Sequence, residues 1–172
     1  MTDFRELNPE DLRGNPFSLI GKNWMLITAG TREKFNTMTA SWGGLGVLWD
    51  RNVCFAFVRP SRYTFEFLEK SAGFTLCFFD ESWRDKLLLC GTESGRNVDK
   101  VKKTGLAPVF TKNGNVWFEQ AWLMIECRKI AFTDLDPEHF LDPKIKDFYE
   151  GPDYHRVYIG EIERILARPF PP

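Results

Sequence analysis

The sequence predicts a single domain that is mainly β with short helices, and three observations favour a sheet closed into a barrel. Most apolar residues fall in short runs that alternate with polar residues or are apolar throughout, as strands do. Helical patterns are few, and they do not alternate with strands as a parallel βαβ fold requires. The run from Ala121 to Thr133 exceeds an average strand, and barrel strands of this length bend or bulge. With 172 residues the chain can bury a sizeable core, so one domain is expected over residues 1–172.

The expected strands follow one another without an internal repeat or a low-complexity linker. Val53–Val58 is apolar on both faces, which predicts a strand between packed layers. Asn113-Gly114 favours a two-residue hairpin turn between Val109-Phe110 and Val116-Trp117. Strands are expected at Trp24–Ala29, Phe35–Trp42, Val53–Val58, Gly73–Phe79, Val116–Phe118, Ala121–Thr133 and Arg156–Leu166.

Three short helices are expected, from Ser61 to Lys70, from Ser82 to Gly91 and from Ser94 to Lys103. Ser61 and Ser82 can cap helix N-termini, because their hydroxyls accept hydrogen bonds from backbone N–H groups of the first turn. In the first helix, Thr64 and Leu68 share one face. Gly91 suits the left-handed conformation that ends many helices.

The composition is that of an ordinary globular protein, with 43% hydrophobic and 27% charged residues, so disorder is not expected. The 15% aromatic content, with 16 Phe and 6 Trp, predicts a cofactor pocket or a large subunit interface in addition to a core. A net charge of −1 argues against nucleic-acid binding driven by charge. The first residues lack the apolar region of a secretory signal, and no apolar run approaches the ~20 residues of a membrane span. A cytoplasmic protein without a membrane segment is therefore expected.

Several common chemistries have no support in the sequence. The four cysteines lie singly in apolar stretches without a CxxC spacing, which predicts buried, reduced thiols: Cys54, Cys77, Cys90 and Cys127. The two histidines lack acidic ligands at a suitable spacing, so no metal site is expected. The sequence has no Walker loop, HExxH motif or nucleophile elbow, and Gly43-Gly44-Leu45-Gly46 does not have the GxGxxG spacing. The missing fingerprint does not exclude a nicotinamide nucleotide that binds only transiently.

The most informative segment is a polar strand that ends in Trp42 and is followed by two glycines. Its side chains alternate, with Met38, Ala40 and Trp42 on one face and Thr37, Thr39 and Ser41 on the other, after Asn36. One face can pack in a barrel while the other meets a ligand. Free backbone N–H and C=O groups at the strand edge can then bond the rim of a planar ring. The alternative is a threonine-rich edge strand that binds nothing.

Two cationic segments predict binding sites for an anion. Helix N-termini offer free N–H groups, arginine adds paired donors, and glycine lets the backbone approach a ligand. The first segment supplies Arg59, Ser61, Arg62, Tyr63 and Thr64, and the second supplies Ser94, Gly95, Arg96 and Lys100. Together with the polar strand they match the needs of flavin mononucleotide (FMN), which has a planar ring and a phosphate. The sequence leaves open which segment holds the phosphate, and solvated helix ends are the alternative.

Four segments, in this order, resemble the motifs of the flavin reductase-like family of FMN-binding split barrels, and the flavoredoxin branch is the most similar. They are Asn36–Trp42, Arg59–Thr64, Gly91–Lys100 and Tyr154–Ile162, and the resemblance covers nearly the whole chain. It implies a six-stranded split barrel, bound FMN, and a homodimer with flavin sites at or near its interface.

His155 matches the histidine that leads the last strand of this family, so it is the candidate catalytic residue beside the flavin or nicotinamide. It could orient the electron donor or tune protonation of the reduced ring, and a structural histidine is the alternative. His139 lies in a turn at the start of a helix and is expected to be structural. Trp42 and Phe170 could each cover a face of the flavin ring.

Three functions remain open. The leading one is an FMN oxidoreductase of flavin reductase type that accepts electrons at flavin N5, with NAD(P)H as donor, and passes them to an acceptor. The second is a flavoredoxin-like electron carrier fed by a protein partner. The third is a binding module that has kept the fold and lost the flavin. The sequence does not determine whether NADH or NADPH is the donor, or which molecule is the final electron acceptor.

Overall fold

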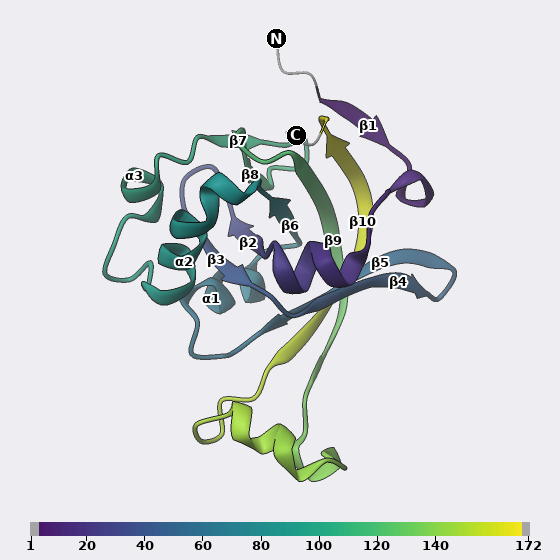
Figure 1. Ribbon diagram of the computed structural model, residues 1–172, viewed down its shortest axis with the longest axis vertical. Coiled ribbons are helices and arrows are strands. Elements are labelled where there is room, and N and C mark those ends of the chain that lie inside the picture. The colour runs from purple at the N-terminus through teal and green to yellow at the C-terminus, as the bar shows by residue number, and fades with distance from the viewer. Residues whose placement is uncertain (1–3, 170–172) are drawn as a thin grey trace.

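The computed structural model describes residues 4–169, which form one strongly curled β-sheet with the three α-helices gathered at one side of the molecule (Figure 1). The strands are β1 (Arg5–Leu7), β2 (Met25–Gly30), β3 (Phe35–Ala40), β4 (Gly43–Leu48), β5 (Arg51–Val58), β6 (Gly73–Phe78), β7 (Pro108–Phe110), β8 (Val116–Phe118), β9 (Leu123–Asp134) and β10 (Arg156–Ala167). The helices are α1 (Tyr63–Lys70), α2 (Arg84–Thr92) and α3 (Lys100–Thr104). Phe170 lies outside the described residues.

The strand order explains why this barrel is split. The order is β3-β2-β6-β9-β10-β5-β4, and β1 adds to β10, so the main sheet has 8 strands with β3 and β4 at its edges. Only Ser41 and Trp42 join these two edges. Their ends, Ala40 and Gly43, therefore lie within about 11 Å of each other, because consecutive Cα atoms are ~3.8 Å apart. The sheet curls until its edges meet at one corner without pairing along their length.

The mainly β split-barrel prediction is confirmed, and three details of it are wrong. The sheet has more than the six strands that the resemblance implied. The polar strand ends at Ala40, so Trp42 lies in the corner between two strands. Strand β4 was not predicted, because its glycines have low strand propensity.

The β7–β8 hairpin forms where Asn113-Gly114 predicted it, with a different turn. The N–H of Thr111 donates to the carbonyl of Asn115 at 2.9 Å, which leaves three residues in the loop. Gly114 has φ 83°, the left-handed conformation that a three-residue loop requires at this position. Along β9, the pairing with β10 shifts register between Ile159 and Gly160 and again between Ile162 and Arg164, so the expected irregularity of the long strand is confirmed.

The helices form in the predicted places with other boundaries. In α1, Thr64 and Leu68 are buried as expected, but Arg62 occupies the cap position and no side chain caps the helix. Before α2, Asp80 accepts from the N–H of Ser82, so the aspartate is the cap of this region. Gly91 continues α2 instead of ending it, because its backbone is helical.

Helix α3 begins later than predicted. Asp99 caps it through the N–H of Lys102, and Gly105 ends it at φ 74°. The residues from Ser94 to Val98 form a turn, in which the N–H of Val98 donates to the carbonyl of Ser94 at 3.1 Å. Asp99 is a better N-cap than Ser94-Gly95 and directly precedes the lysine-rich turn, so the helix begins after Asp99.

Two apolar clusters hold the fold together, one on each face of the curled sheet. The inner cluster includes Ile27, Met38 and Tyr158, and the outer cluster packs Leu26 and Cys90 beneath α2. Neighbouring residues of β2 therefore enter opposite clusters, as the two-residue period of a strand requires. All four cysteines are buried, as predicted, and none forms a disulfide, although the sulfurs of Cys54 and Cys127 lie 3.2 Å apart. Within residues 4–169, no helix has the length and apolar character needed to span a membrane.

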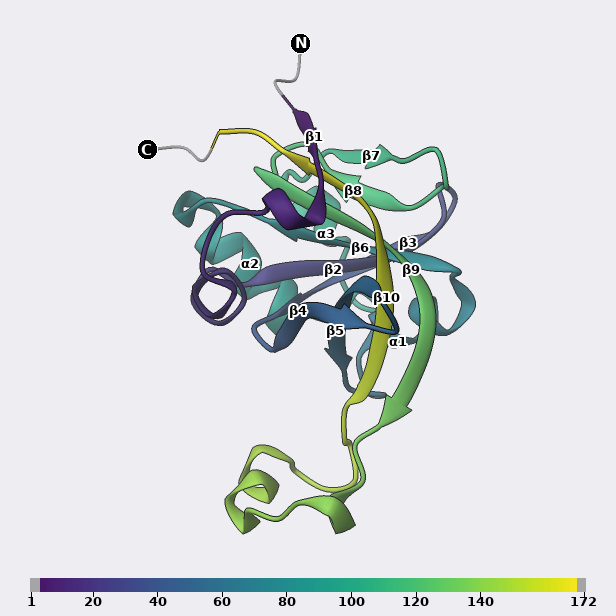
Figure 2. The ribbon, with the colours of Figure 1, turned by 90° about the vertical axis from the view of Figure 1, so that its right-hand side faces the viewer.

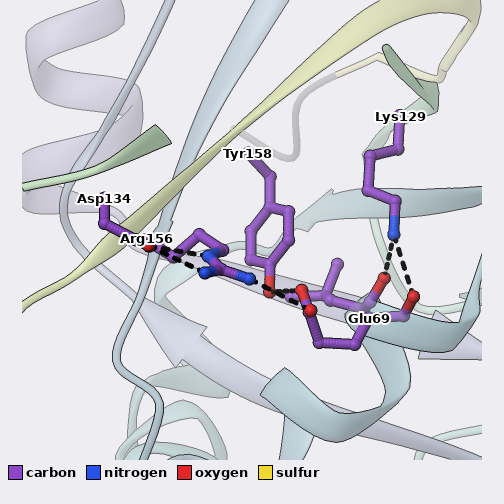
Figure 3. Close-up of polar contacts among 6 residues, drawn as sticks. Glu69, Lys129, Asp134, Arg156 and Tyr158 are labelled. Carbon is purple, nitrogen blue, oxygen red and sulfur yellow. Dashed lines mark hydrogen bonds and ion pairs between the residues drawn. The ribbon is translucent and has the colours of Figure 1, made fainter. Parts of the chain in front are cut away.

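An arm of residues 135–154 extends from the barrel between β9 and β10 (Figures 1 and 2). A polar network fixes its base (Figure 3). Arg156 donates to Asp134 at 2.6 and 2.8 Å and to Glu69 at 3.0 Å, and the hydroxyl of Tyr158 donates to Glu69 at 2.6 Å. Lys129 donates to the carbonyls of the last turn of α1. The network joins the ends of both long strands to α1.

Candidate functional site

A pocket of about 320 Å³ opens at the corner where β3 ends. Its wall comes from the end of β3, the corner to β4, the end of β5, the turn before α1, helix α2 and the residues before β10. It is lined by Met38, Thr39, Ala40, Ser41, Trp42, Phe57, Arg59, Ser61, Arg62, Gly91, Asp153 and His155. The structure thus brings together most of the polar strand, half of the first cationic segment and His155, whereas Gly91 alone represents the third predicted segment, Gly91–Lys100. Its volume lies at the lower end of the range for small-molecule sites.

The open edge of β3 faces this pocket with its backbone. The carbonyl of Thr37 accepts from Lys100 Nζ at 2.8 Å, so it turns away from β2. In an antiparallel pair, backbone groups alternate between the partner strand and the free side with a period of two residues. The N–H and C=O groups of Thr39 therefore turn toward the same free side, and Ser41 follows the end of the strand at the pocket. The edge predicted from the polar strand is present at the pocket.

The threonine side chains of this strand have partners within the protein. The hydroxyl of Thr37 is 2.9 Å from that of Thr28, and the hydroxyl of Thr39 donates to the carbonyl of Leu87 at 2.5 Å. Asn36 donates to the buried hydroxyl of Thr64 at 2.8 Å. These contacts attach β3 to its neighbours. Because the threonine hydroxyls are already hydrogen-bonded within the protein, the strand offers a ligand mainly its backbone edge. The roles of Asn36, Thr37 and Thr64 in binding flavin stay predictions.

The turn before α1 supplies the cationic side of the pocket. Arg59 donates to the carbonyl of Phe148 at 2.7 Å, and its guanidinium lies 5.1 Å from the centre of the Tyr149 ring. Arg62 donates to the carbonyl of Gly91 at 2.7 Å. Burial lowers the pKa of Arg62, and the guanidinium of Arg59 adds to this effect. Two guanidiniums therefore share one corner in which positive charge is concentrated.

Lys100 lies behind this corner and is 5% exposed. Its ammonium donates to the carbonyls of Thr37 and Cys90, both at 2.8 Å. The Cys90 carbonyl belongs to the last turn of α2, where carbonyls lack partners within the helix. Burial lowers the pKa of Lys100 to about 8. Lys100 therefore joins α2 to β3 and does not line the pocket.

The second predicted anion segment also lies outside the pocket. Arg96 donates to Glu66 at 2.5 Å and covers the ring of Tyr63, with 4.7 Å between guanidinium and ring centre. A side chain at Gly95 would collide with Asn36, so this glycine serves close packing. Ser94 Oγ accepts from the N–H of Arg96 at 3.2 Å in the turn before α3. Binding of a ligand by these residues remains a prediction.

His155 lines the pocket from the start of β10 and is 8% exposed. Its Nδ1 is 2.9 Å from the hydroxyl of Tyr149, and its ring centre is 5.0 Å from that of Trp42. Burial lowers the pKa of His155 to about 4, the Arg59 guanidinium adds to the shift, and Asp153 opposes it. The imidazole is therefore neutral at pH 7 and offers the pocket hydrogen bonds without a charge.

Sequence reasoning missed the contribution of the arm. Asp153 lines the pocket, Tyr149 bonds His155, and Phe148 packs against Trp42 with 5.7 Å between ring centres. The available signal was the aromatic and acidic run that directly precedes His155. His139 is exposed in a short turn that Asp136 caps, as expected for a structural residue.

A larger hollow of about 770 Å³ lies elsewhere, between α1 and the β2–β3 and β7–β8 turns. Of the predicted site residues, only Tyr63 lines it. Its charged groups are of both signs, and Arg128 pairs with Glu163 at 3.2 Å within it. The predicted chemistry converges on the smaller pocket, which we take as the candidate site.

Comparison with known proteins supports the family that the motifs suggested. Residues 17–169 match the flavin reductase like domain, so the chain belongs to this family. Flavoredoxin from Methanosarcina acetivorans shares the fold with a TM-score of 0.66, at 21% identity over 86% of this chain and 69% of that one. No curated protein sequence matched the chain.

Two further solved structures have the same fold. An FMN-binding domain of a flavin reductases-like enzyme from Shewanella baltica gives a TM-score of 0.70, at 15% identity over 96% of this chain and 78% of that one. The NADH:FAD oxidoreductase SgcE6 of Streptomyces globisporus gives 0.63, at 16% identity over 86% and 76% of the two chains. Identities this low establish a common fold alone, so the activity of this chain has to be inferred from its own residues.

Proposed function

We propose that this chain binds FMN in the pocket at the β3 corner and works as a flavin-dependent oxidoreductase. Membership of the flavin reductase-like family supports a flavin-related redox role. The observation that carries the proposal is the convergence on one pocket of an open strand edge, an aromatic wall and a pair of guanidiniums. These are the three features that a planar ring with a polar rim and a phosphate needs.

The pocket residues fit the parts of FMN by their chemistry. Trp42 offers an aromatic face, and the backbone of Thr39 and Ser41 offers donors and acceptors for the rim of a ring. Arg59 and Arg62 offer paired donors for a phosphate. When bound, the flavin supplies the redox chemistry by accepting and releasing electrons through its ring. Fixed backbone N–H donors beside the ring would stabilise the negative charge that develops on its reduction.

His155 would act as a neutral hydrogen-bonding group in this reaction. Its low pKa keeps the imidazole uncharged, and the bond to Tyr149 fixes its ring. A neutral imidazole can orient an electron donor over the ring, but it is a poor proton source at pH 7. We therefore favour the orienting role over proton transfer.

A homodimer also belongs to the proposal. Large apolar side chains near the pocket and on the β4–β5 hairpin are exposed, among them Trp42, Trp49 and Phe148. Trp49 and Asp50 form the tip of this hairpin with φ 53° and 55°, which holds the tryptophan out from the barrel. A second copy that covers these groups would also enclose the pocket, since Trp42 lines it and Phe148 packs against Trp42.

The electron donor separates two candidate functions. Both a flavoredoxin and an NADH:FAD oxidoreductase have this fold, so the fold supports an enzyme and a carrier equally. We propose NAD(P)H as donor, because Trp42 is 42% exposed, so the mouth of the pocket is open to a second molecule. A carrier reduced by a protein partner is the second candidate.

Anaerobic reduction tests the proposal. The purified protein is loaded with FMN and mixed with NADH or NADPH while the flavin absorbance is followed. Bleaching by either nucleotide supports the oxidoreductase. FMN that stays oxidised with both nucleotides but is bleached by dithionite would favour the carrier. A protein that retains no flavin would support the binding module and refute the proposed function.

A further inference from the structure

The cationic corner of the pocket already holds a carboxylate from the chain itself. Asp153 Oδ1 accepts from the backbone N–H of Ser61 at 3.0 Å, and Asp153 Oδ2 accepts from the Ser61 hydroxyl at 2.5 Å. These are the two Ser61 donors that the sequence assigned to a ligand anion. Both oxygens of one carboxylate therefore occupy the place predicted for a phosphate.

The neighbouring cation is also bound by the arm. Arg59 donates to the carbonyl of Phe148, five residues before Asp153, and covers the ring of Tyr149. The arm therefore contacts this corner through a carboxylate and a carbonyl, both of which are hydrogen-bond acceptors. A phosphate offers acceptors of the same kind with more negative charge.

The charge of the arm agrees with this arrangement. Residues 135–154 contain six acidic residues and two lysines, opposite the paired guanidiniums of the pocket. Asp153 is the acidic side chain of the arm that lines the pocket. The base of the arm is held by Arg156 between Asp134 and Glu69 (Figure 3), so Asp153 lies close to a fixed anchor.

We propose that Asp153 is a specificity-determining residue that competes with the phosphate of the bound ligand for Ser61. This inference rests on the proposed function and goes further, because it concerns the selection between flavins. FMN must displace the carboxylate from Ser61 in order to place its phosphate there. Riboflavin carries the same ring without a phosphate, so it binds without breaking this contact. Asp153 thus weakens the binding of FMN and not that of riboflavin. The ratio of FMN to riboflavin affinity is therefore lower than the cations of the pocket alone would give.

The test compares FMN and riboflavin affinities of three proteins at one ionic strength, by quenching of flavin fluorescence. Asp153→Ala removes the competing carboxylate. Glu150→Ala is the matched control, because it removes one negative charge from an exposed position of the same arm. We expect Asp153→Ala to raise the ratio of FMN to riboflavin affinity by about tenfold, equivalent to about 1.4 kcal/mol, and Glu150→Ala to leave it within about twofold.

Three other results would overturn the inference. An unchanged or lower affinity ratio in Asp153→Ala would mean that the carboxylate does not compete with the phosphate. An equal rise in Glu150→Ala would assign the effect to the charge of the arm as a whole. Binding of neither flavin by the wild-type protein would refute the proposed function and this inference with it.

Asp153→Asn keeps the test valid if the alanine variant does not fold. The amide retains the size of the side chain and a bond to Ser61 but lacks the charge. It should give a rise in the same direction that is smaller than that of alanine. No rise would count against the competition.

Discussion

The substitution His155→Gln tests whether the pocket holds a neutral imidazole. Burial and the Arg59 guanidinium lower the pKa of His155 from 6.5 to about 4. Between these values the unfolded chain binds a proton at this position and the folded chain does not. The free energy of unfolding therefore falls as the pH is lowered through this window. At pH 4.5 this one group has lost most of a contribution of about 3 kcal/mol to the free energy of unfolding.

Glutamine cannot take up a proton in this range, and it can still bond the hydroxyl of Tyr149. Urea denaturation of the wild type and of His155→Gln at pH 7.5 and 4.5 measures the effect. Carboxylates titrate in both proteins, so their contribution cancels when the two pH-dependent losses are compared. We expect the wild type to lose about 2–3 kcal/mol more than the variant between the two pH values. Equal losses would show that His155 titrates normally and would refute the reasoning on its burial.

Two further predictions concern the core and the phosphate. A Cβ at Gly160 would lie 2.7 Å from the ring of Phe74, so Gly160→Ala should lower the free energy of unfolding by about 1–3 kcal/mol in urea denaturation. Gly21→Ala adds its methyl group in open space and should leave stability nearly unchanged, which makes it the control. Arg62→Ala should weaken FMN binding about tenfold more than riboflavin binding, as expected for one lost charged hydrogen bond. A larger selective loss in Arg96→Ala, measured by the same titration, would move the phosphate to the second cationic segment.

Much of the fold followed from periodicity, because burial on one or both faces of a sheet imposes a pattern on each strand. The strands β5, β6, β8, β9 and β10 lie within a few residues of their predicted places. Strand β4 was missed because Gly43, Gly44 and Gly46 carry no such pattern. It forms because pairing with β5 and the two-residue corner place it there.

The candidate site was predictable as a set of segments and not as a set of contacts. Arg59 and Arg62 could be named because guanidiniums suit an anion, and His155 because it matches the histidine that leads the last strand of the family. Their partners could not be, since the carbonyls of Phe148 and Gly91 depend on how distant segments pack. For the same reason the burial of Lys100 was not foreseen.

Amide hydrogen exchange with and without FMN tests the central claim most directly, because it locates the ligand on the chain. We expect slower exchange at the Thr39 amide of the open β3 edge and at the Ser41 amide just after this strand, and no change at Gly114, which lines the larger hollow. Protection at Gly114 with the β3 edge unaffected would place the flavin in the larger hollow and contradict the proposed site at the β3 corner.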